Sequence, residues 1–150
     1  MIDLPKGCVY MSRNAVVYWS GTGNTEAMAN AVLSGMRENG AVAELFSAPE
    51  FDASMLSDYD SVAFGCPAMG AEELEDFEFG PMFESCKEAL KGKKIALFGS
   101  YGWGGGEWMR SWEDSCRQAG AVLVGESVIC SGAPESEDLE RSKALGKILS

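Results

Sequence analysis

One short stretch, AVVYWSGTGNT from Ala15 to Thr25, constrains the fold of this chain more than any other. Its first half is a compact apolar run with β-branched and aromatic residues, which predicts a buried strand. Its second half, residues 20–25, holds glycines and hydroxyl or amide side chains, and a helical pattern follows directly. A strand that leads through such a turn into a helix N-terminus presents N–H groups and partial positive charge to an anion.

The composition of this turn favours a single phosphate. Glu26 stands where a dinucleotide-binding fingerprint has its third glycine, and no Lys follows the glycines as it does in a P-loop. Residues 20–25 contain neither Lys nor Arg, so that dipoles and hydrogen bonds alone would neutralise the bound charge. A phosphomonoester suits this better than a di- or triphosphate. The alternative is a tight strand-to-helix turn that Thr22 or Asn24 caps.

Length and composition narrow the class of protein. The chain has 150 residues, enough for one domain, and a formal net charge of −11, which disfavours nucleic acid and anionic membranes and suits a basic protein partner. It has five cysteines without a CxxC pair and no His, which gives zinc and c-type haem sites little support. Scattered thiols and the absence of a long apolar run predict a cytoplasmic protein.

Strand and helix patterns alternate along the chain. We expect a first helix that buries Met28, Val32, Gly35 and Met36 and ends at Asn39-Gly40, and a last helix that buries Leu139, Leu145, Ile148 and Leu149. The polar connection at 49–59 has room for a short helix. The expected strands are residues 15–20, 41–46, 61–66, 95–100 and 121–129, and the later helices are residues 81–90, 107–118 and 136–149.

This alternation predicts an α/β fold, a doubly wound parallel sheet between two helical layers. In such a sheet the ligand binds outside the carboxyl ends of the strands. The unusual loops follow the first, third and fourth strands, so all three would meet at that edge.

The second and third of these loops carry side chains that suit a flat ring. Met69, on a glycine turn, has a soft thioether, and Gly70 allows backbone conformations that other residues avoid. Trp103 is flanked by glycines and could face Met69 across a planar ring. An acidic surface turn with a stray Met is the alternative. Trp108 and Trp112, four residues apart on a helix, are expected to be packing residues.

Three segments resemble the flavodoxins, particularly the short-chain kind from anaerobic bacteria: YWSGTGNTEAMAN, FGCPAMGAEELED and GKKIALFGSYGWGGGEWMRSW. The resemblance runs from Asn14 to the C-terminus, and an uninterrupted strand at 121–129 lacks the long insertion of long-chain members. It implies a five-stranded sheet of order 2-1-3-4-5 in a domain at 14–150 that binds FMN without a covalent bond. Residues 1–13 would be an arm or an extension, since Met11 is a possible alternative start.

The resemblance also implies roles for individual residues. The 5′-phosphate would lie on the 20–25 loop, Met69 and Trp103 would flank the isoalloxazine, Glu72 would accept from the ring N3–H, and backbone at Gly102 would meet the pyrimidine edge. The Gly70-Ala71 carbonyl would face N5–H in the semiquinone. Relatives often carry polar residues where this chain has Ala71 and Gly105. The full expected set is Ser20, Gly21, Thr22, Gly23, Asn24, Thr25, Pro67, Ala68, Met69, Gly70, Ala71, Glu72, Ser100, Tyr101, Gly102, Trp103, Gly104 and Gly105.

The function that the resemblance implies is a monomeric, low-potential one-electron carrier rather than an enzyme, acting between redox enzymes such as pyruvate–ferredoxin-type oxidoreductases, hydrogenases or flavodoxin reductases. Negative charge near the ring would oppose reduction to the hydroquinone anion and would also form a rim for basic partners. The acids concerned are Glu72, Glu73, Glu75, Asp76 and Glu78. The alternatives are an FMN-dependent quinone or azo reductase and a binding protein that has lost FMN. A solvated acidic face is the plain alternative for the acid run.

Overall fold

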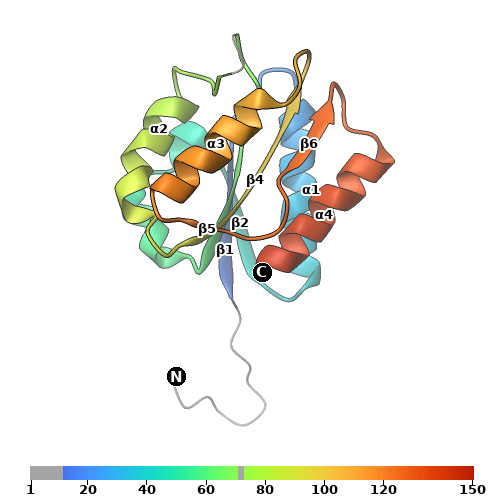
Figure 1. Cartoon of the computed structure of the whole chain (residues 1–150). Helices are drawn as coiled ribbons and strands as arrows, with labels where there is room; N and C mark the ends of the chain where they lie inside the picture. The colour runs from blue at the N-terminus through green and yellow to red at the C-terminus, as the bar shows by residue number, and fades with distance from the viewer. Residues whose placement is uncertain (1–11, 71–72) are drawn as a thin grey trace, which may run out of the picture.

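The computed structural model describes residues 12–70 and 73–150 and shows a twisted sheet between two layers of helices (Figure 1). The strands are β1 (Arg13–Tyr18), β2 (Val42–Ser47), β3 (Ser61–Gly65), β4 (Lys94–Tyr101), β5 (Val122–Leu123) and β6 (Val128–Ser131). The helices are α1 (Asn24–Glu38), α2 (Phe79–Cys86), α3 (Glu107–Gln118) and α4 (Ser136–Leu149), with the short 3-10 helices η1 (Ala48–Glu50), η2 (Ala53–Asp58) and η3 (Lys87–Ala89).

The sheet has the predicted order. Its strands run β2-β1-β3-β4-β5, β6 also pairs with β4, and these pairings are parallel. The two short strands β5 and β6 share the fifth position, so the 2-1-3-4-5 arrangement is confirmed. The expected short helix in the 49–59 connection is present as η2.

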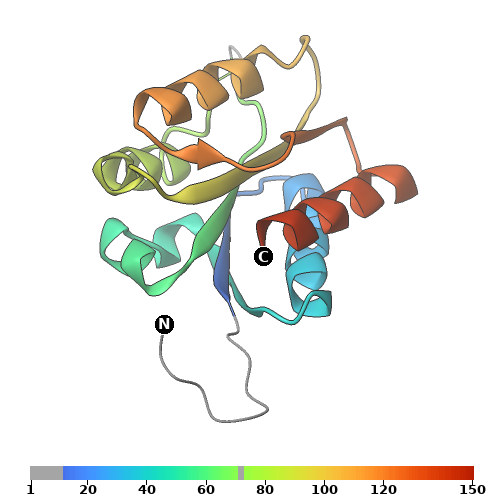
Figure 2. The ribbon, with the colours of Figure 1, turned by 60° about the horizontal axis from the view of Figure 1, so that its bottom comes forward.

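Helices α1 and α4 cover one face of the sheet, and α2 and α3 cover the other (Figures 1 and 2). Successive strand residues therefore enter two separate cores: in β3, Val62 and Phe64 pack on the α2 and α3 side, and Ala63 packs on the α1 and α4 side. A strand buried on both faces reads as a continuous apolar run, which is why the sequence pattern of a parallel sheet was recognisable.

The helices α1 and α4 touch through their backbones. A Cβ added to Gly35 would lie 2.0 Å from the carbonyl oxygen of Lys143, and one added to Gly146 would lie 2.1 Å from that of Val32. The first helix buries the predicted face, Met28, Val32, Gly35 and Met36.

The prediction of one continuous fifth strand at 121–129 is wrong, because the structure has two short strands there, β5 and β6. On β4, Phe98 is three residues after Ile95, but their partners on the paired segment, Leu123 and Val128, are five residues apart. The two extra residues leave the sheet at Gly125, whose φ of +72° is left-handed and breaks the extended conformation.

Two helix predictions also need correction. The helix expected at 81–90 begins earlier, at Phe79, and becomes the 3-10 turn η3 after Cys86. Ile148 was expected to point inward, but its side chain is 61% exposed. The expected Leu145 and Leu149 are buried, together with Ser142 and Gly146. The expected Leu139 is only half-buried, and Ile148 lies on the helix surface.

Of the expected arm at 1–13, the structure describes two residues, and both join the sheet. The Val42 N–H donates to the Ser12 carbonyl (2.8 Å), and Arg13 begins β1. Within the described residues, no helix combines the length and apolar character needed to cross a membrane. The loops after β1, β3 and β4 emerge together at one edge of the sheet, uppermost in Figure 1, as expected.

Candidate functional site

The loop between β1 and α1 folds around the Ser20 hydroxyl. Its oxygen accepts from the N–H groups of Gly23 (3.0 Å) and Glu26 (3.3 Å), and Thr22 Oγ1 accepts from Asn24 N–H (3.4 Å). Gly23 is the N-cap residue of α1, with a φ of +97°, and as a glycine it has no side chain of its own to cap the helix. The alternative of a turn capped by Thr22 or Asn24 is therefore met in part: Thr22 and Ser20 accept from N–H groups in the first turn of α1, whereas Asn24 is itself the first residue of the helix. Their hydroxyls and the positive end of α1 lie together in this loop.

A buried hydroxyl pair joins the start of α1 to the end of β4. Thr25 Oγ1 lies 3.2 Å from Ser100 Oγ and accepts from the Ser100 N–H at 3.4 Å. Both residues are buried. Thr25 thus holds the 20–25 loop against the end of β4.

The loop after β3 is a narrow turn closed by backbone. Met69 N–H donates to the Glu73 carbonyl (2.8 Å) and Glu73 N–H donates back (2.9 Å), while Ala68 N–H donates to the Ser100 carbonyl (3.0 Å). Gly70 has a φ of +50°, the freedom expected of it, and Met69 stays 38% exposed. The two residues that follow, Ala71 and Glu72, lie outside the described residues, so the roles expected of them stay predictions.

Glu75 was expected to be one of the acids of an exposed rim, but its side chain is only 4% exposed, so that expectation is wrong for this residue. Its carboxylate accepts from three successive N–H groups, those of Phe77 (2.7 Å), Glu78 (2.8 Å) and Phe79 (2.7 Å). Burial by itself would raise the pKa of Glu75, but these donors outweigh it and hold the pKa below its ordinary value. Glu75 therefore shapes the turn before α2 rather than facing a partner.

The loop after β4 leaves its tryptophan open. Trp103 is 66% exposed, next to Gly104 with a φ of +87°. Trp108, in contrast, is buried, and its indole N–H donates to the Cys66 carbonyl (3.2 Å). The predicted packing roles of Trp108 and Trp112 are confirmed by their burial.

Cys66, at the start of the loop after β3 that carries Met69, is a buried and inert thiol. Burial raises the pKa of Cys66 to about 12, so the group stays protonated at neutral pH. A Cβ on the neighbouring Gly99 would lie 2.2 Å from the Cys66 carbonyl oxygen, so the backbones of β3 and β4 leave no space there for a side chain.

The three loops enclose a cavity of about 230 Å³. Two of its lining residues, Trp19 and Gly132, were not predicted. Trp19 ends the apolar run before the turn, and Gly132 follows β6 at the same edge. Trp19 also joins two loops, because its indole N–H donates to Glu78 Oε1 (2.9 Å). The predicted residues that line the cavity are Gly21, Thr22, Asn24, Pro67, Ala68, Met69, Ser100, Tyr101 and Gly102.

The other predicted residues lie on the same loops but outside that lining: Ser20, Gly23, Thr25, Gly70, Trp103, Gly104 and Gly105. Larger hollows exist elsewhere, one of about 670 Å³ at the opposite edge and one of about 760 Å³ between α2 and α3. Among the described residues, none of the exposed large apolar side chains lines either hollow, whereas Met69 lines the smaller cavity, so the smaller cavity is the better candidate.

The donor set of the cavity fits an anionic group joined to a flat apolar ring. Hydroxyls and the N-terminus of α1 suit the anion, and Met69 and Trp103 are two of the few exposed large apolar side chains in the described structure. In residues 12–70 and 73–150, no group of His, Cys, Asp or Glu could hold a metal ion.

Comparison with known proteins agrees with this geometry. The model of the flavodoxin family matches residues 16–146. The chain is 43% identical to a flavodoxin of Megasphaera elsdenii over 132 residues, which cover 86% of this chain and 96% of that protein. It is 40% identical to a flavodoxin of Clostridium beijerinckii over 136 residues, 89% of this chain and 99% of the relative.

Solved structures give the same result. The solution structure of two-electron reduced Megasphaera elsdenii flavodoxin superposes with a TM-score of 0.81 at 42% identity, covering 89% of this chain and 98% of that one. A flavodoxin from the domain Archaea gives a TM-score of 0.80 at 28% identity, covering 90% and 94%. With its parallel sheet of order 2-1-3-4-5, the match to the family model and these relatives, the chain belongs to the flavodoxin family of flavin-based electron carriers.

Proposed function

We propose that this protein is a low-potential one-electron carrier that binds FMN without a covalent bond and passes electrons between redox enzymes. One observation carries the proposal: the hydroxyl-lined N-terminus of α1 and the exposed Met69 and Trp103 lie on loops that share one edge of the sheet. An anion site beside exposed apolar side chains suits a phosphomonoester that carries a flat ring.

Each loop would hold one part of the cofactor. The 20–25 loop would bind the 5′-phosphate, Met69 and Trp103 would flank the ring, and the 100–105 backbone would meet its polar edge. When bound, FMN supplies reversible one-electron oxidation and reduction. The chain's own contribution is to orient the ring, keep water from part of it, and set the charge around it.

Acidic side chains near the ring-side loop would lower the reduction potential. Glu73, Asp76 and Glu78 are exposed, and residues 66–86 contain no Lys or Arg. Added negative charge on a reduced ring is disfavoured by neighbouring carboxylates. The Glu73→Gln/Asp76→Asn double variant should raise the potential of the second electron by on the order of tens of millivolts. An unchanged potential would refute this electrostatic role.

The same charges suit partners with basic docking surfaces, such as flavodoxin reductase or other oxidoreductases, and we propose a monomer that acts in the cytoplasm. Two features support this: the net charge of −11, and the free state of Cys66, Cys86, Cys116 and Cys130, the described cysteines. An FMN-dependent quinone or azo reductase is the second candidate. A chain without His offers no imidazole as proton donor for such an enzyme.

Anaerobic stepwise reduction of the FMN-loaded protein, followed by visible absorbance, tests the proposal. A carrier should accumulate singly reduced flavin over a wide range of potential before the second electron enters. Direct passage to the fully reduced flavin would favour a two-electron reductase, and protein that takes up no FMN would leave only a binding role. The Ile148→Ala variant, changed on the far helix α4, is the matched control and should behave as the wild type.

A further inference from the structure

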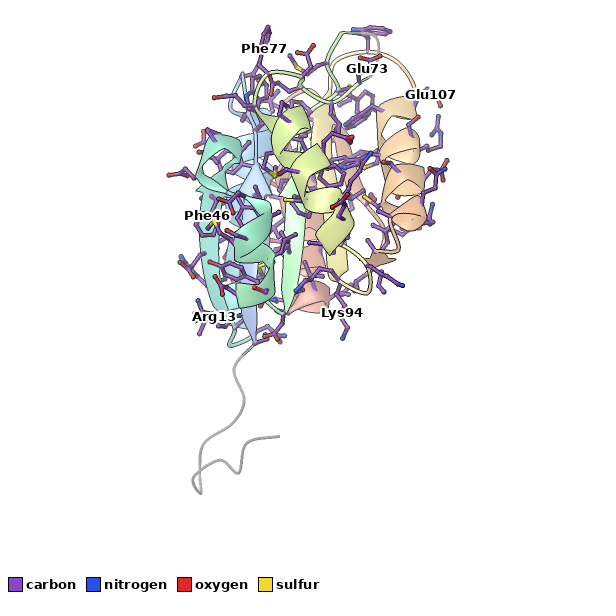
Figure 3. All side chains as sticks on the ribbon, turned by 90° about the vertical axis from the view of Figure 1, so that its left-hand side faces the viewer. Arg13, Phe46, Glu73, Phe77, Lys94 and Glu107 are labelled. Carbon is purple, nitrogen blue, oxygen red and sulfur yellow. The ribbon has the colours of Figure 1, made fainter. Side chains whose placement is uncertain are left out.

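Phe77 is the most exposed of the large apolar side chains in the described structure, with 88% of its surface open to solvent. It lies in the turn between β3 and α2, at the sheet edge that carries the candidate cofactor site (Figure 3). The next aromatic residue, Phe79 at the start of α2, is fully buried. Two aromatic residues only two positions apart therefore have opposite environments.

The turn that presents Phe77 is built around a buried carboxylate. Glu75 accepts from the Phe77 N–H itself at 2.7 Å, and also from Glu78 and Phe79. The backbone carbonyl of Glu75 accepts from Gly80 N–H (2.8 Å). These bonds fix the conformation of the turn, so that Phe77 points outward as a consequence of ordered structure and not of a loose loop.

Phe79 secures the other side of the turn. Its ring stacks on Phe83 with centroids 6.0 Å apart, and it meets Trp112 edge to face at 5.4 Å. The buried ring thus anchors the turn in the core between α2 and α3. Moving Phe77 inward would require breaking either this packing or the hydrogen bonds to Glu75.

The surroundings of Phe77 are acidic. Asp76 and Glu78 flank it in sequence and are exposed, and Glu73 lies at the same end of the molecule, whereas Arg13 and Lys94 lie at the other end (Figure 3). Met69 and Trp103 are the other exposed large apolar side chains on the loops of this edge. An apolar centre with a charged rim is the usual composition of a protein–protein interface.

We propose that Phe77 is an apolar anchor by which basic redox proteins dock beside the cofactor site, and that its ring enters an apolar patch bordered by lysines or arginines. The acids around it would steer such a partner and set its orientation, and the aromatic ring would slow its dissociation. This inference rests on the proposed carrier function and adds the chemistry of the contact. A second copy of this chain, with a net charge of −11, would be repelled.

Ferric cytochrome c, a basic redox protein with an exposed haem edge, is a suitable probe. Titration of the oxidised FMN-loaded protein with ferric cytochrome c measures the Kd without electron transfer. We expect Phe77→Ala to raise the Kd by about tenfold at both low and high salt, as for an aromatic hot spot. Phe77→Leu should recover most of the affinity, and Ile148→Ala, an exposed apolar residue on α4, should change nothing.

The rate of electron transfer gives a second readout. Reduced protein passes one electron to each ferric haem, and the rate constant at low cytochrome concentration should fall in parallel with affinity in Phe77→Ala. The slope of the rate constant against ionic strength should stay as in the wild type, because no charge is removed. The Asp76→Asn/Glu78→Gln variant should instead flatten that slope.

Each contrary outcome is specific. Equal Kd values for wild type and Phe77→Ala would refute the anchor role of Phe77 but not the carrier function. A Kd increase that vanishes at high salt would also refute the anchor role, because it would mean that the substitution acts by displacing the neighbouring acids. A wild type that sediments as a dimer, lost in Phe77→Ala, would give Phe77 to a contact between copies. A wild type that binds FMN but reduces no cytochrome c overturns both this inference and the carrier function.

Discussion

The two edges of the sheet are built in opposite ways. At the amino edge, where β1 and β3 begin, polar groups close on one another: Asn14 Nδ2 donates to Ser61 Oγ, and Ser61 Oγ donates to the carbonyl of Leu149 (3.1 Å). Lys93 Nζ donates to the carbonyls of Leu56 (3.0 Å) and Tyr59 (2.7 Å). At the carboxyl edge, hydroxyls gather at the N-terminus of α1 and large apolar side chains face solvent.

This difference indicates that the amino edge contributes mainly to the stability of the fold and the carboxyl edge mainly to ligand binding. Groups at the amino edge satisfy each other, so that this end needs no ligand to complete it. At the carboxyl edge, hydrogen bonds of Glu75 and Thr25 hold the loops in place. Their outward side chains, such as Met69 and Trp103, nevertheless face solvent. The ends also differ in charge: residues 66–86, which include Glu73, contain no Lys or Arg except Lys-free and Arg-free acidic positions, whereas Arg13 and Lys94 lie at the other end (Figure 3).

The largest expected effect comes from filling the contact between β3 and β4 beneath the site. Gly99→Ala would place a Cβ 2.2 Å from the Cys66 carbonyl oxygen, and backbone cannot yield there. We expect a loss of at least about 3 kcal/mol in the free energy of unfolding, measured by urea denaturation. Gly40→Ala at the amino edge meets open space and should lose only about 1 kcal/mol, through its left-handed φ.

A result in which the two glycine variants lose equal stability would break the comparison, because it would mean that the sheet can spread at Gly99. Gly102→Ala on the loop above has open space and no positive φ, so it should be close to neutral.

The second effect is a dependence on pH. Glu75→Gln keeps the shape but removes the charge that accepts from three N–H groups, and it should cost about 2 kcal/mol at pH 7. The folded-state pKa of Glu75 lies below the ordinary 4.5, so its stabilisation is complete above that value and is lost as pH falls through the folded pKa. The cost of the substitution should therefore shrink in acid.

The uncharged network at the amino edge is the control for this titration. Asn14→Ala should cost about 1 kcal/mol, with the same difference from wild type at pH 7 and in acid. Both variants would be unfolded in urea at a series of pH values with excess FMN. A Glu75→Gln cost that stays constant down to the acid range would contradict the buried carboxylate's role.

Much of this architecture was predictable from local patterns. Strand β3 reads as a continuous apolar run because both of its faces are buried, and the α1 stripe of Met28, Val32 and Met36 has helical spacing. The three site loops were predictable for the same reason, since parallel strands place successive carboxyl ends at one edge.

Other features depend on contacts that sequence spacing does not encode. Glu75 looks like one more acid in an exposed run, and only the path of the turn brings three N–H groups to its carboxylate. The split between β5 and β6 follows from register against β4, which a single-sequence pattern cannot show. Trp19 read as the end of a buried strand, although its indole reaches Glu78 across two loops.

The smallest expected effect tests that last contact. Trp19→Phe removes the N–H that donates to Glu78 Oε1 but keeps an aromatic ring in the cavity lining, so the two loops lose one hydrogen bond between the half-buried Trp19 and the exposed Glu78. We expect FMN affinity to fall about threefold, and the free energy of unfolding without FMN to change by less than about 0.5 kcal/mol. Tyr59→Phe is the counterpart near the amino edge, since it removes the hydroxyl bonded to Glu44 Oε1 (3.0 Å). That variant should leave FMN affinity unchanged in fluorescence titration. Equal losses of affinity in the two variants would mean that cofactor binding depends on general stability, and the functional separation of the two edges would then fail.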